Sequence, residues 1–576
     1  MPTRFRSSAR ILWLLGALIA GSTTVAGRLF WLQIVASEHF DELAAEQRER
    51  TIVLAPQRGS IMAQDGTELA ISMDMRTVYA NPRSIPNPGE AAAALAPILK
   101  TDPAKLESRL SADSGFVYLA RRIDPAIAQR VKEVGIPGVE LIAESKRFYP
   151  AGRLASQVIG FVGNDNRGLG GLEVRYDELL RGTPGKMLTE RDPSGTRIPS
   201  GKSFLKRPVQ GDDVVLTLDK QIQFEAEAAL DRARKAWGAQ GGTVIVMNPK
   251  TGAILAMANS PTFDPNNLKS STASSRRNRG AVDVYEFGSV NKLITAAAAL
   301  EVGVIAPSDL MSLPDHMRIG SKVFRDSHPH PRQTLSFTQV MERSSNIGTI
   351  RVAERLGKQR LYEYLSRFGY GSRTGLDFPG QSIGILPKPE KWWATSLGTI
   401  SIGQGVAVTP LHLMKAYATV ANDGVEVQPN LILGTIDASG RRHRPEPPRT
   451  RRVISSSTAK ELTDILLGVI ESEDGTGRAA AIPGYRVAGK TGTAQKPRQG
   501  VPGYAGYVSS FVGFAPAEDP QLVVGVVLDD PDPMYAGSTA AVTFREVMQF
   551  SLRRLGVSPG PVTDPQGISL VARVNP

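Results

Sequence analysis

The first apolar segment lies near the amino terminus and has the length of a membrane-spanning helix. Residues Ile11–Gly27 contain no charged side chain, and apolar character resumes after Arg28 in the run LFWLQIV. As a helix, residues 11–27 cover about 25 Å at about 1.5 Å per residue, and the following run extends this toward the roughly 30 Å of a bilayer core. Because Arg4, Arg6 and Arg10 precede the span, the positive-inside rule predicts a cytoplasmic amino terminus.

A cleaved signal peptide is the alternative, because LIAGS and TTVAG offer the small residues that such cleavage needs. The apolar run outlasts the roughly 7–15 residues of a typical signal core, which favours a retained anchor. We therefore expect residues 1–10 to be a cytoplasmic tail and residues 11–35 to be a transmembrane helix.

Residues 36–210 show a pattern that changes every few positions, which predicts short strands and helices joined by turns. Asp65–Gly66 marks a turn between two short strands. Helical spacing covers Glu90–Leu99 and Ala104–Leu110, and Pro103 suits the first turn of the second helix. The sequence here offers no nucleophile–base pair, paired acids or cluster of metal ligands, so we interpret the region as an α/β spacer.

Residues 211–560 begin and end with strands and hold helices between them. The polar residues 260–280 are expected to form a mobile loop, and residues 561–576 a tail. Strands at both ends with helices between them predict an α+β domain with an antiparallel sheet. Strands are expected at Asp213–Leu218, Thr243–Asn248, Ala253–Asn259, Tyr507–Ala515 and Gln521–Leu528, and helices at Gln221–Ala236 and Thr539–Arg554.

Composition narrows the function classes. The chain has 576 residues and should hold two or more domains. The absence of cysteine from the sequence excludes thiol nucleophiles, disulfides and zinc–thiolate sites. A net charge of +12 suits an anionic partner, but no nucleic-acid module is present, and a dispersed surface charge explains the excess equally well. The six histidines, including the loop pair His328 and His330, show no metal-ligand spacing.

A serine and a lysine lie three residues apart in YEFGSVNKLITAAAAL, residues 285–300. A helix brings residues i and i+3 onto one face, so the Ser289 hydroxyl and the Lys292 amine become neighbours. Gly288 permits a tight turn into this helix. The apolar stripe that follows predicts burial, which lowers the pKa of lysine, and a neutral amine can accept the serine proton.

Two further S-x-x-K pairs show how weak the pattern is alone. Ser203 and Lys206 lie in the polar run PSGKSFLKRP, which we interpret as a linker. Ser457 precedes Lys460 in SSSTAKELTDILL, where Ser457 or Thr458 is expected to cap a helix, Thr458 with a capping box. Capping explains most such serines, so the middle pair needs support from other motifs.

Two later motifs give that support. Ser344 and Asn346 lie in a polar SSN triplet at the joint between two helical runs, where a helix cap is the alternative explanation. Lys490 begins a KTGT run in a strand-like pattern. A strand of this kind at a sheet edge can pair with an extended peptide.

Together the motifs supply the catalytic groups that acyl transfer requires: a nucleophile, a base and a proton path to the leaving amine. Ser289 and Lys292 supply the first two, and Ser344 with Lys490 can relay a proton. The sequence leaves open which group deprotonates the serine.

The same motifs supply groups for substrate binding. Asn346 can hold a substrate amide, and the Thr491 and Thr493 hydroxyls can bind a carboxylate together with Lys490. Gly492 leaves room for a ligand to approach the backbone. The backbone N–H groups of Ser289 and Thr493 can form an oxyanion hole.

The order S-x-x-K, S-x-N, K-T-G resembles the motif set of β-lactamases and penicillin-binding proteins, and other stretches narrow the resemblance to class B penicillin-binding proteins. Three stretches are similar to pedestal motifs, one to the active-serine motif and one to a later family stretch. Phe287 stands where proline is usual and Asn291 where an apolar residue is usual. The stretches are Arg58–Ala70, Lys146–Gly163, Gly170–Gly185, Asn278–Lys292 and Gly403–Gly424.

The resemblance implies a fold and a reaction. The fold is a single membrane anchor, an elongated α/β pedestal over residues 36–210, and a serine β-lactamase-like transpeptidase domain over 211–560 with helices around its sheet. In the reaction, Ser289 attacks the D-Ala-D-Ala bond of a peptidoglycan stem peptide and releases D-alanine, and a neighbouring stem amine resolves the acyl-enzyme. β-Lactams would acylate the same serine. No metal or organic cofactor is implied.

The resemblance also implies a place and partners. The protein would be a single-pass protein of the bacterial inner membrane with an extracytoplasmic catalytic domain. Its implied partners are a SEDS-family glycan polymerase, which contacts anchor and pedestal, and division proteins. Length, one anchor and no added carboxy-terminal module are more similar to the division subgroup than to the elongation subgroup.

Two other functions use the same motifs. A D,D-carboxypeptidase or β-lactamase-type hydrolase would replace the acceptor amine by water, but we identify no matched carboxylate to activate it, and the pedestal motifs disfavour it. A non-catalytic penicillin-binding scaffold or sensor would keep the fold without turnover.

Overall fold

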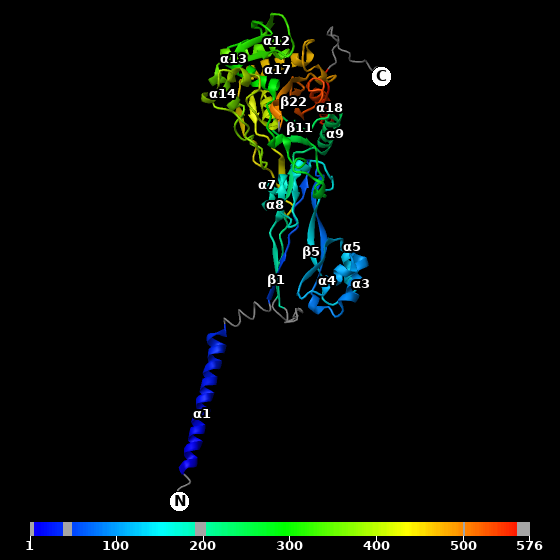
Figure 1. The fold of residues 1–576 in the computed structure, drawn as a ribbon, viewed down its shortest axis with the longest axis vertical. Coiled ribbons are helices and arrows are strands. Elements are labelled where there is room, and N and C mark those ends of the chain that lie inside the picture. Colours follow the sequence, from blue (N-terminus) through cyan, green and yellow to red (C-terminus); the bar gives the residue numbers. More distant parts are fainter. Residues whose placement is uncertain (1–4, 38–48, 191–202, 499–500, 561–576) are drawn as a thin grey trace. The chain divides into compact units, whose positions relative to one another are not determined.

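The computed structural model describes residues 5–37, 49–190, 203–498 and 501–560. One helix in this part of the chain is long and apolar enough to cross a membrane: Ala9–Val35, formed by α1 (Phe5–Phe30) and a π-helical turn (Trp31–Val35) (Figure 1). Its large apolar side chains are exposed, as in a helix that faces lipid. The predicted tail at 561–576 lies outside the described residues.

Contacts divide the chain into two interleaved compact units. Unit 1 comprises residues 1–57, 74–146 and 182–210, and unit 2 comprises 58–73, 147–181 and 211–576. Residues 58–73 and 147–181, which were expected in the pedestal, therefore pack with the residues from 211 onward. The domain boundary between residues 210 and 211 stays a prediction, and the packing follows a different division.

Unit 1 contains long paired strands and a small helical layer. β1 (Glu49–Leu54) pairs with β8 (Gly185–Glu190), which pairs with β9 (Ser203–Lys206). The segment at Ser203, expected to be a linker, is therefore a strand. Its polar sequence does not predict a strand, but pairing with β8 satisfies the hydrogen-bonding groups of its backbone. β4 (Val117–Ile123) and β5 (Val139–Phe148) pair with β3 (Glu68–Ala80).

The helices of unit 1 confirm the sequence expectation closely. α3 (Pro88–Leu99) and α4 (Pro103–Leu110) each begin with proline in the first turn, after the capping side chains of Asn87 and Asp102. Together with α5 (Pro125–Glu133) they supply buried apolar side chains to one core with the sheet. This core includes Val78, Leu95, Leu106, Leu110, Leu119 and Val131.

Unit 2 is built on a five-stranded antiparallel sheet of order β12-β11-β23-β22-β21. Alternate residues of each strand face opposite sides, so Val244 and Val246 join a different core from Ile245 and Met247. The strands are β11 (Gly241–Met247), β12 (Ile254–Ser260), β21 (Ala488–Arg498), β22 (Val501–Ala515) and β23 (Leu522–Asp529).

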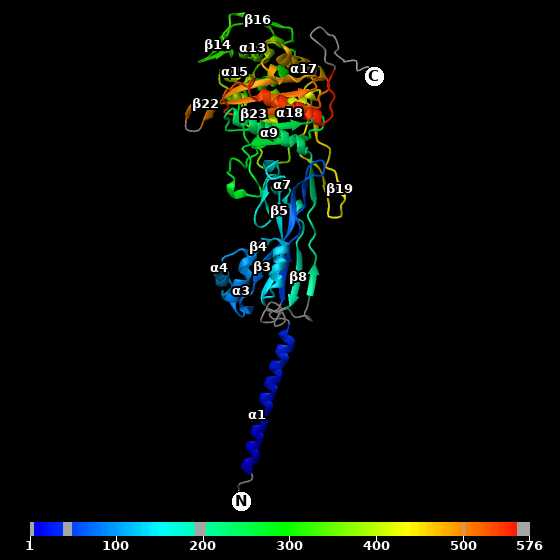
Figure 2. The same cartoon turned by 90° about the vertical axis from the view of Figure 1, so that its right-hand side faces the viewer.

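Helices cover both faces of this sheet. α9 (Lys220–Ala236) and α18 (Ala540–Arg554) pack in the core on one face (Figure 2). α11 (Lys292–Glu301), α13 (Asn346–Leu356) and α16 (Pro410–Ala421) contribute to the core on the other. The predicted α+β fold is confirmed.

Two local expectations need correction. The loop at 260–280, expected to be mobile, is anchored by long-range hydrogen bonds. Gln157 Nε2 donates to Ser275 O at 2.9 Å in a buried bond, and the Tyr149 N–H donates to Asn266 Oδ1 at 3.1 Å in a partly buried one. Polar composition did not reveal these long-range partners. α17 (Ser456–Glu471) begins earlier than expected, and its cap is Ser455.

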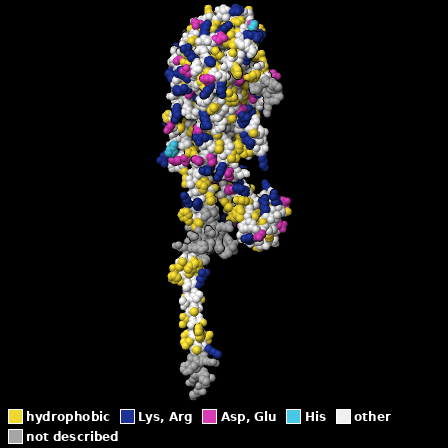
Figure 3. Space-filling view, turned by 60° about the vertical axis from the view of Figure 1, so that its left-hand side comes forward, with side chains coloured by type: hydrophobic (Ala, Val, Ile, Leu, Met, Phe, Trp, Pro, Cys, Tyr) yellow, Lys and Arg dark blue, Asp and Glu magenta, His cyan; other side chains and the backbone are white. Residues whose placement is uncertain are grey.

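Charged side chains are mixed on the molecular surface. In the view of Figure 3, lysine and arginine side chains are interspersed with aspartate and glutamate. This distribution agrees with the interpretation of the +12 net charge as a dispersed excess.

A buried ionic cluster joins two segments of unit 2, residues 58–73 and 147–181. The two carboxylate oxygens of Glu173 accept one hydrogen bond each, from Arg58 Nε at 2.7 Å and from Arg147 Nε at 2.6 Å. Arg58 also pairs with Asp177 at 2.7 Å. All three central side chains are at most 1% exposed, so each charge depends on its partners.

We predict that Glu173→Gln destabilises unit 2 by about 3–5 kcal/mol, because two buried guanidinium groups lose their shared carboxylate. Urea unfolding followed by tryptophan fluorescence measures this. Glu471→Gln is the matched control, since Glu471 pairs with Arg486 at the surface at 2.9 Å and should change stability by less than about 1 kcal/mol. Equal effects of the two substitutions would contradict the prediction.

Candidate active site

Ser289 lies in a tight turn that leads into a buried helix. The turn is a 3-10 helix, Gly288–Asn291, and α11 begins at Lys292. The serine was expected at the start of an α-helix; the structure places it in the 3-10 turn before α11, where Gly288 adopts φ +60°. Ser289 is partly exposed, whereas Val290, Asn291 and Lys292 are buried.

The serine turn packs directly against β21, the edge strand that carries the KTGT run. A Cβ at Gly492 would lie 2.6 Å from Phe287 O and 3.0 Å from Val290 Cγ1. A Cβ at Gly288 would lie 3.1 Å from Ala494 Cβ. Residues 287–290 and 492–494 are therefore in backbone contact, and only glycine permits this approach.

The Lys292 amine joins the first two motifs. It donates to Ser344 O at 2.7 Å and to Asn346 Oδ1 at 2.8 Å, and lies 3.4 Å from Ser344 Oγ. Ser344 adopts φ +57° between α12 (Phe337–Glu342) and α13, a left-handed conformation unusual for serine. Ser345 caps α13, as the alternative explanation of this triplet proposed.

Burial gives the two lysines unusual proton affinities. Lys292 and Lys490 are each 0% exposed. Burial lowers the pKa of Lys292 to about 7, and the Asp326 carboxylate opposes this shift. Burial, followed by the charge of Lys292, lowers the pKa of Lys490 well below its ordinary value. Since the charge of Lys292 disfavours the charged form of Lys490, the two amines lie in one electrostatic environment.

The remaining predicted residues lie along β21. Thr491 Oγ1 donates to Thr476 Oγ1 at 2.8 Å, and the Lys490 amine lies 3.5 Å from the same oxygen. Thr493 Oγ1 accepts from the Ala536 N–H at 3.2 Å. The structure thus brings all eight predicted residues to one edge of the sheet.

Two residues at this edge were not found from the sequence. Asp326 accepts from Asn346 N and Ile347 N at 2.5 and 3.0 Å and from Ser345 Oγ at 2.8 Å, so it holds the SSN triplet in place. Thr476 contacts both side chains named above on β21. Neither belongs to a motif or a periodic run, and their roles arise only from tertiary contacts.

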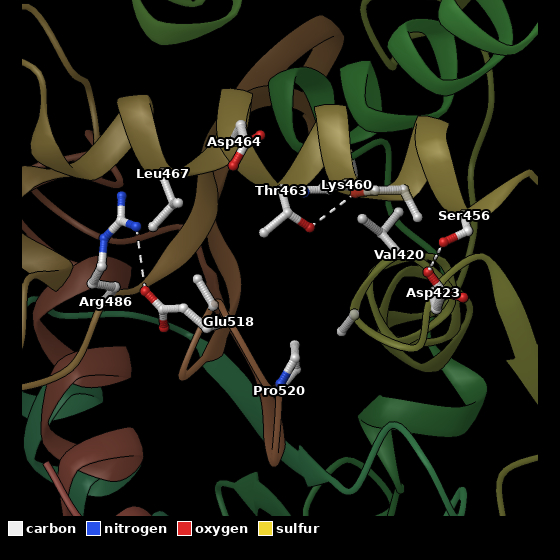
Figure 4. Close-up of a pocket in the computed structure, with 13 residues that line it drawn as sticks. Val420, Asp423, Ser456, Lys460, Thr463, Asp464, Leu467, Arg486, Glu518 and Pro520 are labelled. Atoms are coloured by element: carbon white, nitrogen blue, oxygen red, sulfur yellow. Dashed lines mark hydrogen bonds and ion pairs between the residues drawn. The ribbon is translucent and has the colours of Figure 1, made fainter. Parts of the chain in front are cut away.

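A cavity of about 400 Å³ lies elsewhere in unit 2, against α17 (Figure 4). Its polar side chains pair with one another: Arg486 with Glu518 at 3.3 Å, and Ser456 with Asp423. The lining, all within the described part of the chain, includes none of the predicted site residues. The predicted site residues lie instead at the edge of β21.

The fold and the edge site define a penicillin-binding protein. Residues 242–549 match the family model "Penicillin binding protein transpeptidase domain", and residues 53–216 match "Penicillin-binding Protein dimerisation domain". The chain belongs to the penicillin-binding protein family, and the prediction of its class B branch is confirmed.

Individual relatives cover nearly the whole chain. Penicillin-binding protein PbpB of Mycolicibacterium smegmatis is 35% identical over 95% of this chain and 91% of its own. The probable peptidoglycan D,D-transpeptidase PbpC of Pseudomonas aeruginosa is 36% identical over 98% of both. The structure of penicillin-binding protein 3 from Mycobacterium tuberculosis, complexed with aztreonam, matches with TM-score 0.70 and 30% identity, covering 88% of this chain and 98% of that one.

We predict that Gly492→Ala destabilises unit 2 by about 1–3 kcal/mol, because the new methyl group overlaps the backbone of the serine turn. Thermal unfolding measures the change. Gly115→Ala is the control: the nearest atom to its Cβ is 3.9 Å away, so stability should change by about 0.5 kcal/mol or less. An unchanged unfolding temperature for Gly492→Ala would show that the turn does not need this approach.

Proposed function

We propose that the protein is a peptidoglycan D,D-transpeptidase that crosslinks stem peptides through a serine acyl-enzyme. The observation that carries this proposal is the meeting of Lys292 with Ser344 and Asn346 beside the Ser289 turn, directly against the KTGT edge strand. Family membership and the names of its relatives agree with this enzyme class.

In the first half-reaction, Ser289 Oγ attacks the carbonyl carbon of the penultimate D-alanine. Lys292, whose amine is substantially neutral near pH 7, accepts the serine proton. The C–N bond then breaks, and the leaving D-alanine takes a proton through Ser344 and Lys490. In the second half-reaction, an acceptor amine attacks the ester, loses its proton by the reverse path and releases the Ser289 hydroxyl.

Substrate binding is proposed along β21. Among the described strands only β22 pairs with β21, so an extended stem peptide can add to the opposite edge as a further strand. Thr491 and Thr493 with Lys490 would bind the terminal carboxylate, and Asn346 would release Lys292 to hold a substrate amide. The N–H groups of Ser289 and Thr493 would stabilise the oxyanion.

The cellular setting follows from the resemblance and the apolar helix. We place the amino terminus in the cytoplasm and the catalytic unit outside the inner membrane, with residues 11–35 as the anchor. The protein would crosslink peptidoglycan at the septum, together with a SEDS-family glycan polymerase and division proteins. This partner can be tested by replacing residues 11–35 with an unrelated anchor and measuring co-purification with such a polymerase. Loss of co-purification would support the partner, and retained co-purification would count against contact through the anchor.

A β-lactam, as a mimic of the donor peptide, is expected to add one acyl group to Ser289. Mass spectrometry after treatment should show the adduct in the wild type and none in Ser289→Ala. Ser457→Ala, from another S-x-x-K pair, is the control and should be acylated like the wild type. Labelling that persists in Ser289→Ala would remove this serine from the mechanism.

The same variants separate the alternatives when donor and acceptor peptides are supplied. Crosslinked product is expected, and it should disappear in Ser289→Ala. Free acid without crosslinks would identify a hydrolase, and drug binding without turnover of either kind would identify a scaffold or sensor.

Acylation should depend on pH through Lys292. Below a pH of about 7 its amine is protonated and cannot accept the serine proton, so the rate should fall about tenfold per pH unit and level off above 7. The second-order rate constant for a fluorescent penicillin, measured between about pH 5 and pH 9, tests this. A constant rate through that interval would assign deprotonation to another group.

A further inference from the structure

Asn291 is a buried polar residue inside the serine turn that the mechanism does not use. It is 2% exposed, and its Oδ1 accepts from the Tyr370 hydroxyl at 2.6 Å. Its Nδ2 has no hydrogen-bond partner among the described residues. A buried unpaired donor is unfavourable, and an apolar side chain at position 291 would avoid it. The hydrogen bond that Asn291 accepts from Tyr370 is therefore the contact that distinguishes asparagine from an apolar residue here.

Tyr370 reaches the turn from a segment that is distant in the sequence. It is 2% exposed, lies between Gly369 and Gly371, which both have positive φ, and packs edge-on against His412 with ring centroids 6.2 Å apart. Burial raises the pKa of Tyr370 far above its ordinary value, so its hydroxyl remains a donor at neutral pH.

A second tyrosine holds the neighbouring residue. Tyr417 of α16 is fully buried and donates its hydroxyl to Val290 O at 2.9 Å. On the other side of the serine, the Gly288 N–H donates to Gly403 O at 3.1 Å. Residues 288, 290 and 291 are therefore each tied to a different part of unit 2, while Ser289 between them remains partly exposed.

We propose that Tyr370 and Tyr417 are positioning residues that clamp the 3-10 turn and thereby fix the Ser289 hydroxyl relative to Lys292. This inference rests on the proposed acyl transfer. A 3-10 turn has poorer internal hydrogen-bond geometry than an α-helix, so external hydrogen bonds determine its conformation. Attack on a carbonyl requires accurate placement of the nucleophile, and small displacements lower the rate strongly.

The test compares acylation with stability in four single variants and one double variant. Tyr370→Phe and Tyr417→Phe remove one hydroxyl each and keep the ring. Tyr485→Phe is the matched control, because its hydroxyl also donates to a backbone carbonyl, Val557 O at 2.7 Å, away from the serine turn. Asn291→Leu removes the unpaired amide together with the acceptor of Tyr370. The readouts are the acylation rate constant for a fluorescent penicillin and the thermal midpoint of the full chain in detergent.

Tyr370→Phe and Tyr417→Phe should each lower the acylation rate constant about tenfold. Their thermal midpoints should shift no more than that of Tyr485→Phe. The acylation rate constant of Tyr485→Phe should equal that of the wild type. Asn291→Leu should also lower the rate, and its midpoint gain from losing the unpaired amide is offset because the Tyr370 hydroxyl is left buried without its acceptor. Adding Tyr370→Phe to Asn291→Leu removes that hydroxyl, so the double variant should have a higher midpoint and a rate constant that falls no further.

A wild-type rate in Tyr370→Phe, or in the double variant with Asn291→Leu, would overturn the clamp, since a purely structural contact makes rate follow stability. These outcomes are distinct from failure of the proposed function. That failure would appear as absence of acylation in the wild type and in Tyr485→Phe alike.

Discussion

The site depends on a backbone-to-backbone approach between the serine turn and its neighbours. Three glycines make it possible: Gly288 in the turn, Gly492 on β21 and Gly403 in the loop beyond, where a Cβ would lie 2.1 Å from Gly288 O. Segments roughly two hundred residues apart in sequence meet here without side chains between them. The nucleophile, the SSN triplet and the peptide-pairing edge can then share one small region.

That approach also explains the chemistry of the lysines. Close packing excludes water from two amines, and a cation deprived of water is unstable unless an anion compensates it. Asp326 acts on Lys292 and favours its charged form, but its oxygens are already occupied by two backbone N–H groups and a serine hydroxyl. The compensation is therefore incomplete, and the neutral amine, the form that accepts a proton, becomes accessible near neutral pH.

Sequence patterns predicted the residues that bear reactive groups and missed those that hold them. Ser289, Lys292 and Lys490 were found because spacing and residue type carry the chemistry directly. Asp326 and Tyr370 were missed because their roles depend on contacts across tens of residues. Hydrophobic periodicity predicted the sheet and helices of unit 2 but could not show that Ser203 pairs in a strand, since the partner of an edge strand is set by tertiary structure.

The buried cluster of Arg58, Arg147 and Glu173 bears on how such a chain matures. During synthesis from the amino terminus the two arginines emerge before the glutamate that neutralises them, and the sheet that completes unit 2 emerges later still. Until then, desolvation of either guanidinium is opposed by its hydration. Arg58 thus has no buried partner while the insertion 74–146 of unit 1 is translated, so this ionic cluster can form only after that insertion has been made.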